Sequence, residues 1–304
     1  MRCLSRASAT ALALTLAPAL PCPALAHAGH DHHADAIQWT LSPGVVLPLA
    51  LALLLYLVGW RRLAHRSTRE MPRRRAGMFF AGWIIMAGAL VSPLHAGGER
   101  SFALHMIEHE LIMLPAALLL VAARPGPVLL WGLPALARQA LAPMLRWPLW
   151  RALTAPATAT LLQAGALILW HLPALFDRAL RSDGWHIAQH ASFVGTALLF
   201  WWAMLPQRRS DSGLFPAVCL FVTSMVGSGL GALMALASSP WYPAYAAKGT
   251  MPLGLSPEAD QQLAGVIMWV PGGLFHLVAA LVLLGRALRA NRQPFQPQKF
   301  STTV

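Results

Sequence analysis

The sequence predicts an all-α membrane protein, a polytopic bundle of about seven transmembrane helices. Hydrophobic residues make up 57% of the 304-residue chain, while charged residues account for 11%. Soluble domains contain roughly 25% charged residues, so the composition argues against a large soluble core. Apolar runs of about 20 residues, the length that crosses a bilayer, recur along the chain. Basic residues gather in short clusters between those runs.

Residues 1–42 precede the predicted membrane domain. Residues 1–26 combine a basic start, a short apolar run and the sequence Ala24-Leu25-Ala26, which together predict a cleavable secretory signal peptide. Residues 27–42 begin with a histidine-rich tract, so we expect a periplasmic tail there. Such a tract can collect metal weakly, can chelate copper through a new N-terminal His27, or can remain a solvated tail without a specific ligand.

Seven spans are expected between residues 43 and 285, followed by a basic tail over residues 286–304. Residues 128–145 are also apolar, but Pro134 and Pro143 interrupt them and Arg138 lies between. An interfacial segment is therefore expected there rather than an eighth span. The predicted spans are Pro43–Trp60, Ala76–Ala96, Phe102–Ala123, Leu153–Leu172, Trp185–Leu205, Leu214–Ala237 and Gln261–Gly285.

The distribution of Lys and Arg predicts the topology. With the mature N-terminus outside, the cytoplasmic loops and tail hold 17 Lys and Arg residues, and the outer loops hold 4. The positive-inside rule therefore places the N-terminus in the periplasm of a multi-pass inner-membrane protein. The same clustering accounts for the net charge of +12. No nucleic-acid partner is expected, because no recognition motif accompanies the charge.

Under this topology, histidines from four spans lie near the outer membrane face. Ionisable side chains within a spanning helix are costly, and they mark functional sites. The third and fifth spans each carry a histidine pair at i, i+4, a spacing that lets both rings reach one ion. A glutamate on the same face of the third span can ligate or orient a ring. The predicted ligands of one shared site are His95, His105, Glu108, His109, His171, His186 and His190.

The ligand types favour copper as the metal. Imidazole suits copper, zinc, iron and nickel, and a thioether shifts the preference towards Cu(I). Thioethers expected on the outer side belong to Met106, Met251 and Met268, although methionine in an apolar helix usually packs. Asp177 and Asp260 are carboxylates at the same face. The three cysteines form no metal motif, since two lie in the signal region and Cys219 lies in an apolar helix.

Other functions fit some of the same residues. His105 to His109 reads His-x-x-Glu-His, an arrangement found in zinc metalloproteases. An intramembrane zinc hydrolase is disfavoured, because the second pair carries Gln189, which cannot act as a base, and no matched third ligand follows. Paired histidines on facing helices also suit haem ligation, so a haem-binding or haem-handling protein is the main alternative. A scaffold in which the histidines merely pack is a third possibility.

Five spaced motifs stand out along the chain. They are His105-Met106-x-x-His109-x-Leu111-x-Met113-x-Pro115, Trp170-His171-x-Pro173-x-x-x-Asp177, His186-x-x-x-His190, Pro240-Trp241-Tyr242-x-x-Tyr245 and Asp260-Gln261-Gln262-x-x-Gly265-x-x-Met268-Trp269-x-x-Gly272-Gly273. Together they resemble the motifs of one family, the CtaG assembly factors of caa-type cytochrome c oxidase, over about residues 41–285. The resemblance implies an inner-membrane protein, with the lipid bilayer and oxidase subunits as partners, that handles copper for the oxidase and catalyses no reaction.

Overall fold

A computed structural model describes residues 39–66, 72–144, 147–205, 213–247 and 254–291. All regular elements in these ranges are helices, which confirms the predicted all-α class. The predicted signal peptide, the histidine-rich tract, Met251 and residues 292–304 lie outside the described residues.

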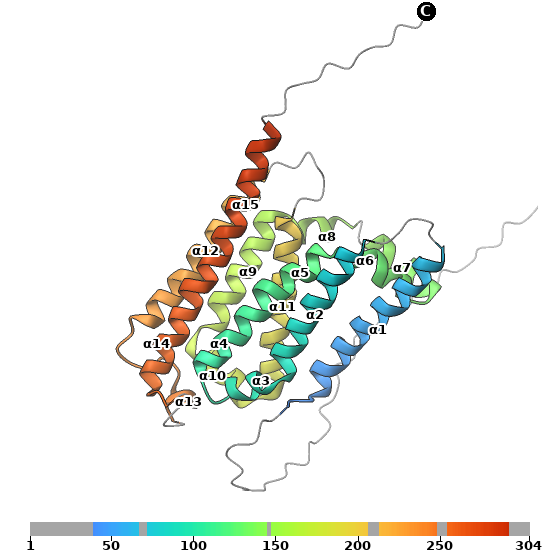
Figure 1. The fold of residues 1–304 in the computed structure, drawn as a ribbon. Coiled ribbons are helices and arrows are strands. Elements are labelled where there is room, and N and C mark those ends of the chain that lie inside the picture. Colours follow the sequence, from blue (N-terminus) through green and yellow to red (C-terminus); the bar gives the residue numbers. More distant parts are fainter. Residues whose placement is uncertain (1–38, 67–71, 145–146, 206–212, 248–253, 292–304) are drawn as a thin grey trace, which may run out of the picture. The chain divides into compact units, whose positions relative to one another are not determined.

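The described helices follow one another with short connections (Figure 1). In chain order they are α1 (Pro43–Arg66), α2 (Arg73–Val91), α3 (Pro93–Gly98), α4 (Phe102–Leu111), the π-helical turn η1 (Ile112–Ala116), α5 (Ala117–Ala122), α6 (Gly126–Gly132), α7 (Ala135–Met144), α8 (Pro148–Leu153), α9 (Pro156–Trp170), α10 (Pro173–Arg181), α11 (Asp183–Met204), α12 (Leu214–Ala235), α13 (Pro243–Ala246), α14 (Pro257–Ile267), the π-helical turn η2 (Met268–Gly272) and α15 (Gly273–Asn291).

Several of these helices are long and apolar enough to cross a membrane. Five candidates are Pro43–Arg66, Arg73–Val91, Phe102–Ala122, Leu214–Ala235 and Pro257–Arg289, and the pair α9 and α10, bent by 75°, would make a sixth. The remaining expected span corresponds to α11, a helix of 22 residues. Its N-terminal half carries polar residues, including both histidines, which lower its mean hydropathy. The protein is thus a multi-pass membrane protein, while the count of seven stays a prediction.

Two of the candidate spans are interrupted by π-helical turns that contain proline. Pro115 lies within η1, between α4 and α5, and Pro271 lies within η2, between α14 and α15. Proline lacks an N–H and cannot continue the α-helical hydrogen bonding, so the chain widens locally. Side chains of other helices then bond the backbone carbonyls. The Trp201 Nε1 donates to the carbonyl oxygen of Met113, 2.8 Å away.

His95 lies on a separate short helix and not at the end of the second span. The expected span 76–96 ends at Val91, because Pro93 cannot donate to the preceding turn and instead begins α3. The Ser92 hydroxyl accepts a hydrogen bond from the Leu94 N–H at 3.3 Å and caps the new helix. The end of α3 lies close to α4, since a Cβ added to Gly98 would be 3.2 Å from the Cα of His105.

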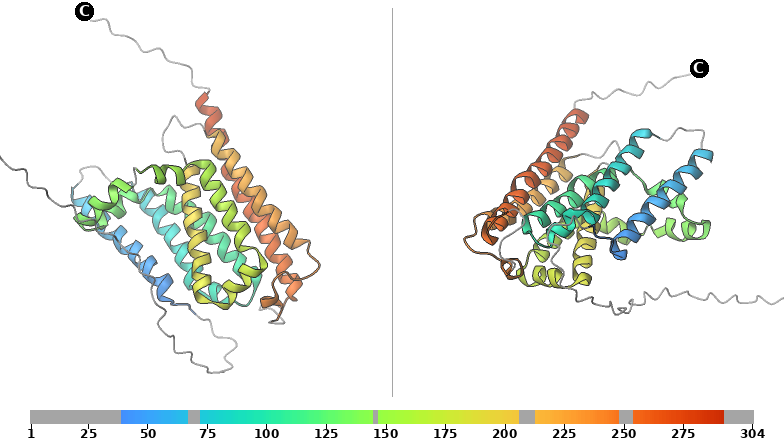
Figure 2. Two further views of the ribbon diagram at one scale, coloured as in Figure 1. Left: turned by 180° about the vertical axis from the view of Figure 1, so that it is seen from behind. Right: turned by 60° about the horizontal axis from the view of Figure 1, so that its bottom comes forward.

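The apolar segment around residues 128–145 forms the short helices α6 and α7, and neither is among the candidate spans. Helix α6 packs directly on α1. A Cβ added to Gly59 would lie 1.8 Å from the Val128 carbonyl oxygen, so only glycine permits this approach. Arg62 donates to three carbonyl oxygens at the end of α6, at 3.0 to 3.1 Å. Figures 1 and 2 show α6 and α8 at the opposite end of the long helices from α3, α10 and α13.

Candidate metal centre

The predicted histidine pairs converge at the end of the bundle that holds α3 and α10. In each pair the rings are adjacent, with centroids 4.2 Å apart for His105 and His109 on α4 and 4.5 Å apart for His186 and His190 on α11. The two pairs also meet across the helix interface, because the centroids of His109 and His190 are 5.2 Å apart. Three helices therefore contribute rings to one cluster once His95 of α3 is included, with its ring centroid 5.1 Å from that of His186.

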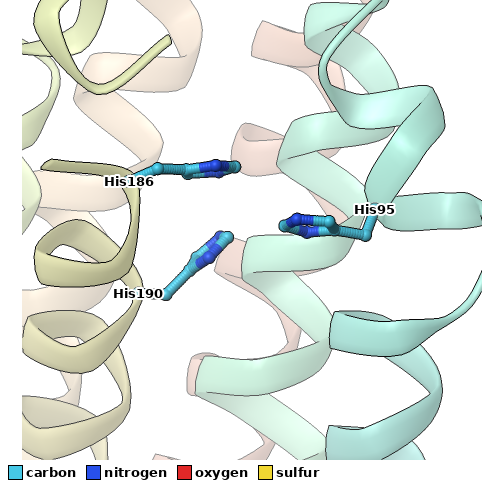
Figure 3. A group of neighbouring side chains, drawn as sticks. All are labelled: His95, His186 and His190. Atoms are coloured by element: carbon cyan, nitrogen blue, oxygen red, sulfur yellow. The ribbon is translucent and has the colours of Figure 1, made fainter. Parts of the chain in front are cut away.

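Two groups of three imidazoles are close enough to hold a metal ion. One consists of His95, His186 and His190, and the other of His105, His109 and His190. Within each group, one ring nitrogen per residue lies within 4.8 Å of the others. Figure 3 shows the first group, in which His186 and His190 extend from one helix towards His95 on the opposite side. His190 belongs to both groups.

Several ring nitrogens of the clustered histidines are buried and have no hydrogen-bond partner among the described residues. His105 and His109 are each 1% exposed, and their ring nitrogens have no hydrogen-bond partner within the described residues. The Nε2 atoms of His186 and His190 likewise lack one there. A buried polar atom without a partner is unfavourable, and nearly all such atoms in folded proteins are satisfied by protein, water or an ion. Imidazole nitrogens gathered this closely fit a metal ion, and copper is among the metals that imidazole suits.

Glu108 connects the two groups. Its Oε1 lies 2.8 Å from Nδ1 of His95 and 3.5 Å from Nε2 of His190, and the side chain is fully buried. Burial disfavours the charged form of His95, but the hydrogen bond to Glu108 and the charges of Glu108 and Glu99 outweigh it. The pKa of His95 is therefore raised from its usual value of 6.5. A carboxylate in this position can orient imidazole ligands.

Aromatic side chains cover the cluster. The Phe176 ring of α10 lies 5.2 Å from the His105 ring and 4.4 Å from the Tyr242 ring, centroid to centroid. The Tyr242 hydroxyl donates to the His171 carbonyl oxygen at 3.0 Å, and the Tyr245 hydroxyl donates to the Gly98 carbonyl oxygen. Burial raises the pKa of both tyrosines, so their hydroxyls stay protonated and remain donors. The connection around α13 is thus fixed to α3 and α9 beside the histidines.

Asp260 positions α4 and not a histidine ring. Its carboxylate is 1% exposed and accepts hydrogen bonds from the Ser101 hydroxyl at 2.7 Å and the Phe102 N–H at 2.6 Å. These groups belong to the first turn of α4, whose N–H groups have no partner within the helix. The start of α14 therefore fixes the start of the helix that carries two of the histidines.

Three other predicted residues lie outside the two groups. His171 ends α9, and its Nδ1 lies 2.7 Å from the Leu167 carbonyl oxygen. Its Nε2 is buried without a hydrogen-bond partner in the described part of the chain. Asp177 accepts from the Ala244 N–H at 3.4 Å. Met106, 1% exposed, packs in the hydrophobic core. His276 of α15 also lies apart from both groups, and its Nδ1 is 2.9 Å from the Gly272 carbonyl oxygen.

The fold and this site define a multi-pass membrane protein with a buried polyhistidine cluster. A family model described as cytochrome c oxidase caa3 assembly factor (Caa3_CtaG) matches residues 54–290. The chain belongs to this family, which confirms the resemblance carried by its motifs.

Curated relatives include two uncharacterized proteins, one from Mycobacterium bovis and one from Mycobacterium tuberculosis. Each is 26% identical to this chain over 262 residues, an alignment that covers 82% of this chain and 38% of the relative. The chain therefore spans well under half the length of these relatives. No solved structure matches the chain.

Proposed function

We propose that the protein binds copper, as Cu(I), at the polyhistidine cluster and passes it to a subunit of cytochrome c oxidase. One observation carries this proposal: two groups of three imidazoles share His190. Among the described residues, the ring nitrogens of His105 and His109 and the Nε2 atoms of His186 and His190 are buried without a hydrogen-bond partner. In this proposal His105, His109, His186 and His190 are the principal ligands. His95 completes the second group, Glu108 orients the rings, and His171 is a nearby further candidate.

Ligand exchange gives a simple route for the metal. Because both groups contain His190, an ion held by one group can acquire ligands of the other before it leaves the first. Phe176, which packs on Tyr242, covers the ring of His105 and would keep bulk water from it. Such a transfer would exchange metal–ligand bonds only and would change no covalent bond of a substrate, so we assign no catalytic residue.

The proposed topology places this site at the periplasmic face of the bacterial inner membrane. It comprises a signal peptide over residues 1–26, a histidine-rich periplasmic tail over 27–42, seven spans over 43–285 and a cytoplasmic tail over 286–304. The 17 to 4 distribution of Lys and Arg between the two sets of loops supports it. The lipid bilayer and oxidase subunits are the proposed partners.

Metal analysis of the purified protein tests the proposal. We expect copper in the wild-type protein and an at least tenfold lower content when His105, His109, His186 and His190 are all replaced by alanine. A His65→Ala variant is the matched control, since His65 is exposed at the far end of α1. Oxidase activity in the same strains should fall with the quadruple variant and not with the control.

Two outcomes would contradict the copper assignment. Unchanged copper content in the quadruple variant would show that the histidines only pack. A Soret band in the optical spectrum that disappears in His109→Ala would instead assign the cluster to haem.

A further inference from the structure

A second polar site lies deeper in the bundle, where the two π-helical turns approach each other. It surrounds a cavity of about 20 Å³, which has room for one particle the size of a water molecule. The polar side chains that line it come from α4, α9, α12 and α15, and none of them belongs to either histidine group. They are Glu110, Gln163, Thr223, Ser224, Ser228 and His276.

Glu110 is the acidic side chain of this site. Its Oε2 is buried and has no hydrogen-bond partner among the described residues. A Cβ added to Gly272 would lie 2.6 Å from Oε2 and 3.1 Å from Oε1. The carboxylate therefore lies directly against the backbone of η2, in space that only a glycine leaves open. An ionisable side chain at this depth is costly and is expected to have a partner.

Each of the three hydroxyl groups around the cavity already donates a hydrogen bond to a backbone carbonyl oxygen. Thr223 donates to the Cys219 carbonyl oxygen at 3.1 Å, Ser224 to that of Gly273 at 3.3 Å, and Ser228 to that of Trp269 at 3.4 Å. Because each hydroxyl has one proton, these three oxygens retain only lone pairs.

The two remaining polar side chains follow the same pattern. The Gln163 amide nitrogen donates to Sδ of Met113 at 3.5 Å, and its Oε1 has no partner in the described ranges. Nδ1 of His276 faces the Gly272 carbonyl oxygen, which can only accept, so Nδ1 donates and the Nε2 of the neutral ring is an acceptor. The lining thus offers one carboxylate and several neutral acceptors. Its hydroxyl and imidazole donors are occupied, while the Gln163 amide retains a second N–H.

We infer that this cavity is a binding site for one small monovalent cation of the size of Na⁺. A single water molecule could donate to only two of the acceptors and would leave the carboxylate charge uncompensated. A divalent ion such as Ca²⁺ takes six to eight oxygen ligands, usually with several carboxylates. Among the described residues that line this cavity, Glu110 is the one carboxylate. Oxygen ligands suit hard cations, and interrupted helices form such ion sites in membrane proteins.

A cation here would connect three segments. Glu110 lies near the end of α4, Ser224 and Ser228 lie on α12, and the backbone of Gly272 lies in η2. Helix α4 also carries two of the clustered histidines, so the cation would fix that helix from its deeper end. The inference does not depend on the metal that the histidines bind.

Thermal unfolding of the full chain in lipid nanodiscs, stripped of transition metals, provides the test. NaCl is raised at constant ionic strength against choline chloride. We expect Tm to rise by roughly 5–10 °C and then to level off. This rise applies as the Na⁺ concentration is increased from well below its dissociation constant to about a hundredfold above it. The increase should be lost in Glu110→Gln and retained in Glu258→Gln, the matched control, since Glu258 begins α14 outside the cavity.

Equal Tm values in the two salts, or a Na⁺ response that persists in Glu110→Gln, would overturn the inference. If Glu110→Gln does not fold, Ser228→Ala keeps the carboxylate and removes one oxygen, and it should weaken the apparent Na⁺ affinity at least fivefold. The quadruple histidine variant keeps this cavity, so Na⁺ should still stabilise it. If that variant is stabilised by Cu(I) and not by Na⁺, the inference is also overturned. Copper content should be unchanged in Glu110→Gln. The proposal for this cavity and the proposal for the histidine cluster are then tested independently.

Discussion

Removal of the Asp260 carboxylate should destabilise the membrane domain at the start of α4. Asp260 accepts two short hydrogen bonds, from the Ser101 hydroxyl at 2.7 Å and the Phe102 N–H at 2.6 Å, and a longer one from the Ala103 N–H at 3.4 Å. A hydrogen bond to a charged group contributes about 1.5–3 kcal/mol, and the donors left behind would be buried. The two short bonds together give an expected loss of about 3–6 kcal/mol in Asp260→Ala.

Chemical unfolding of the purified protein in one detergent measures this loss. Asp177→Ala is the matched control, because its contacts to the Ala244 N–H and to the exposed Arg181 are both 3.4 Å long. Contacts of this kind are worth less than about 1 kcal/mol. A free energy of unfolding for Asp260→Ala within about 1 kcal/mol of the wild-type value would refute the capping role. A loss of the same size in the control would refute it as well.

Three further predictions concern the site and the packing of the helices. Glu108→Gln keeps the shape of the side chain but not its charge, and copper affinity measured by competition with a chelator should fall by roughly 10–100-fold; equal affinities would contradict the orienting role. Gly59→Ala places a methyl group 1.8 Å from a carbonyl oxygen of α6 and should cost about 1–3 kcal/mol in thermal unfolding, whereas Gly77→Ala, with open space around it, should cost nothing. Trp201→Phe removes the donor to the Met113 carbonyl oxygen in η1 and should cost about 1–3 kcal/mol; a wild-type Tm would show that the π-helical turn needs no such partner.

The sequence was sufficient to predict the helical class and the main histidine pairs. Both follow from local rules, since apolar length defines a candidate span and the i, i+4 spacing places two rings on one face. His105 and His109, like His186 and His190, are accordingly adjacent in the structure. Their approach across helices could be expected only from the predicted topology.

Other features depend on contacts between distant residues, which a single sequence does not specify. The motif residue Asp260 proved to cap a helix 158 positions away in the chain, and Tyr242 and Tyr245 proved to bond backbone carbonyls beside the histidines. The position of Glu110 against the backbone of Gly272 was not predicted either, although a carboxylate within a spanning helix was a signal for a further polar site. Glu110 lies against Gly272, which is distant in the sequence, so no local pattern predicts this contact.

The position of His190 in both imidazole groups has a consequence for genetics. Replacement of His109 leaves the group of His95, His186 and His190 intact, and replacement of His186 leaves the other group intact. Replacement of His190 removes one member from each group at once. Under the proposed function, a saturation screen for oxidase maturation should therefore find position 190 the least tolerant of the five, with partial phenotypes at the others.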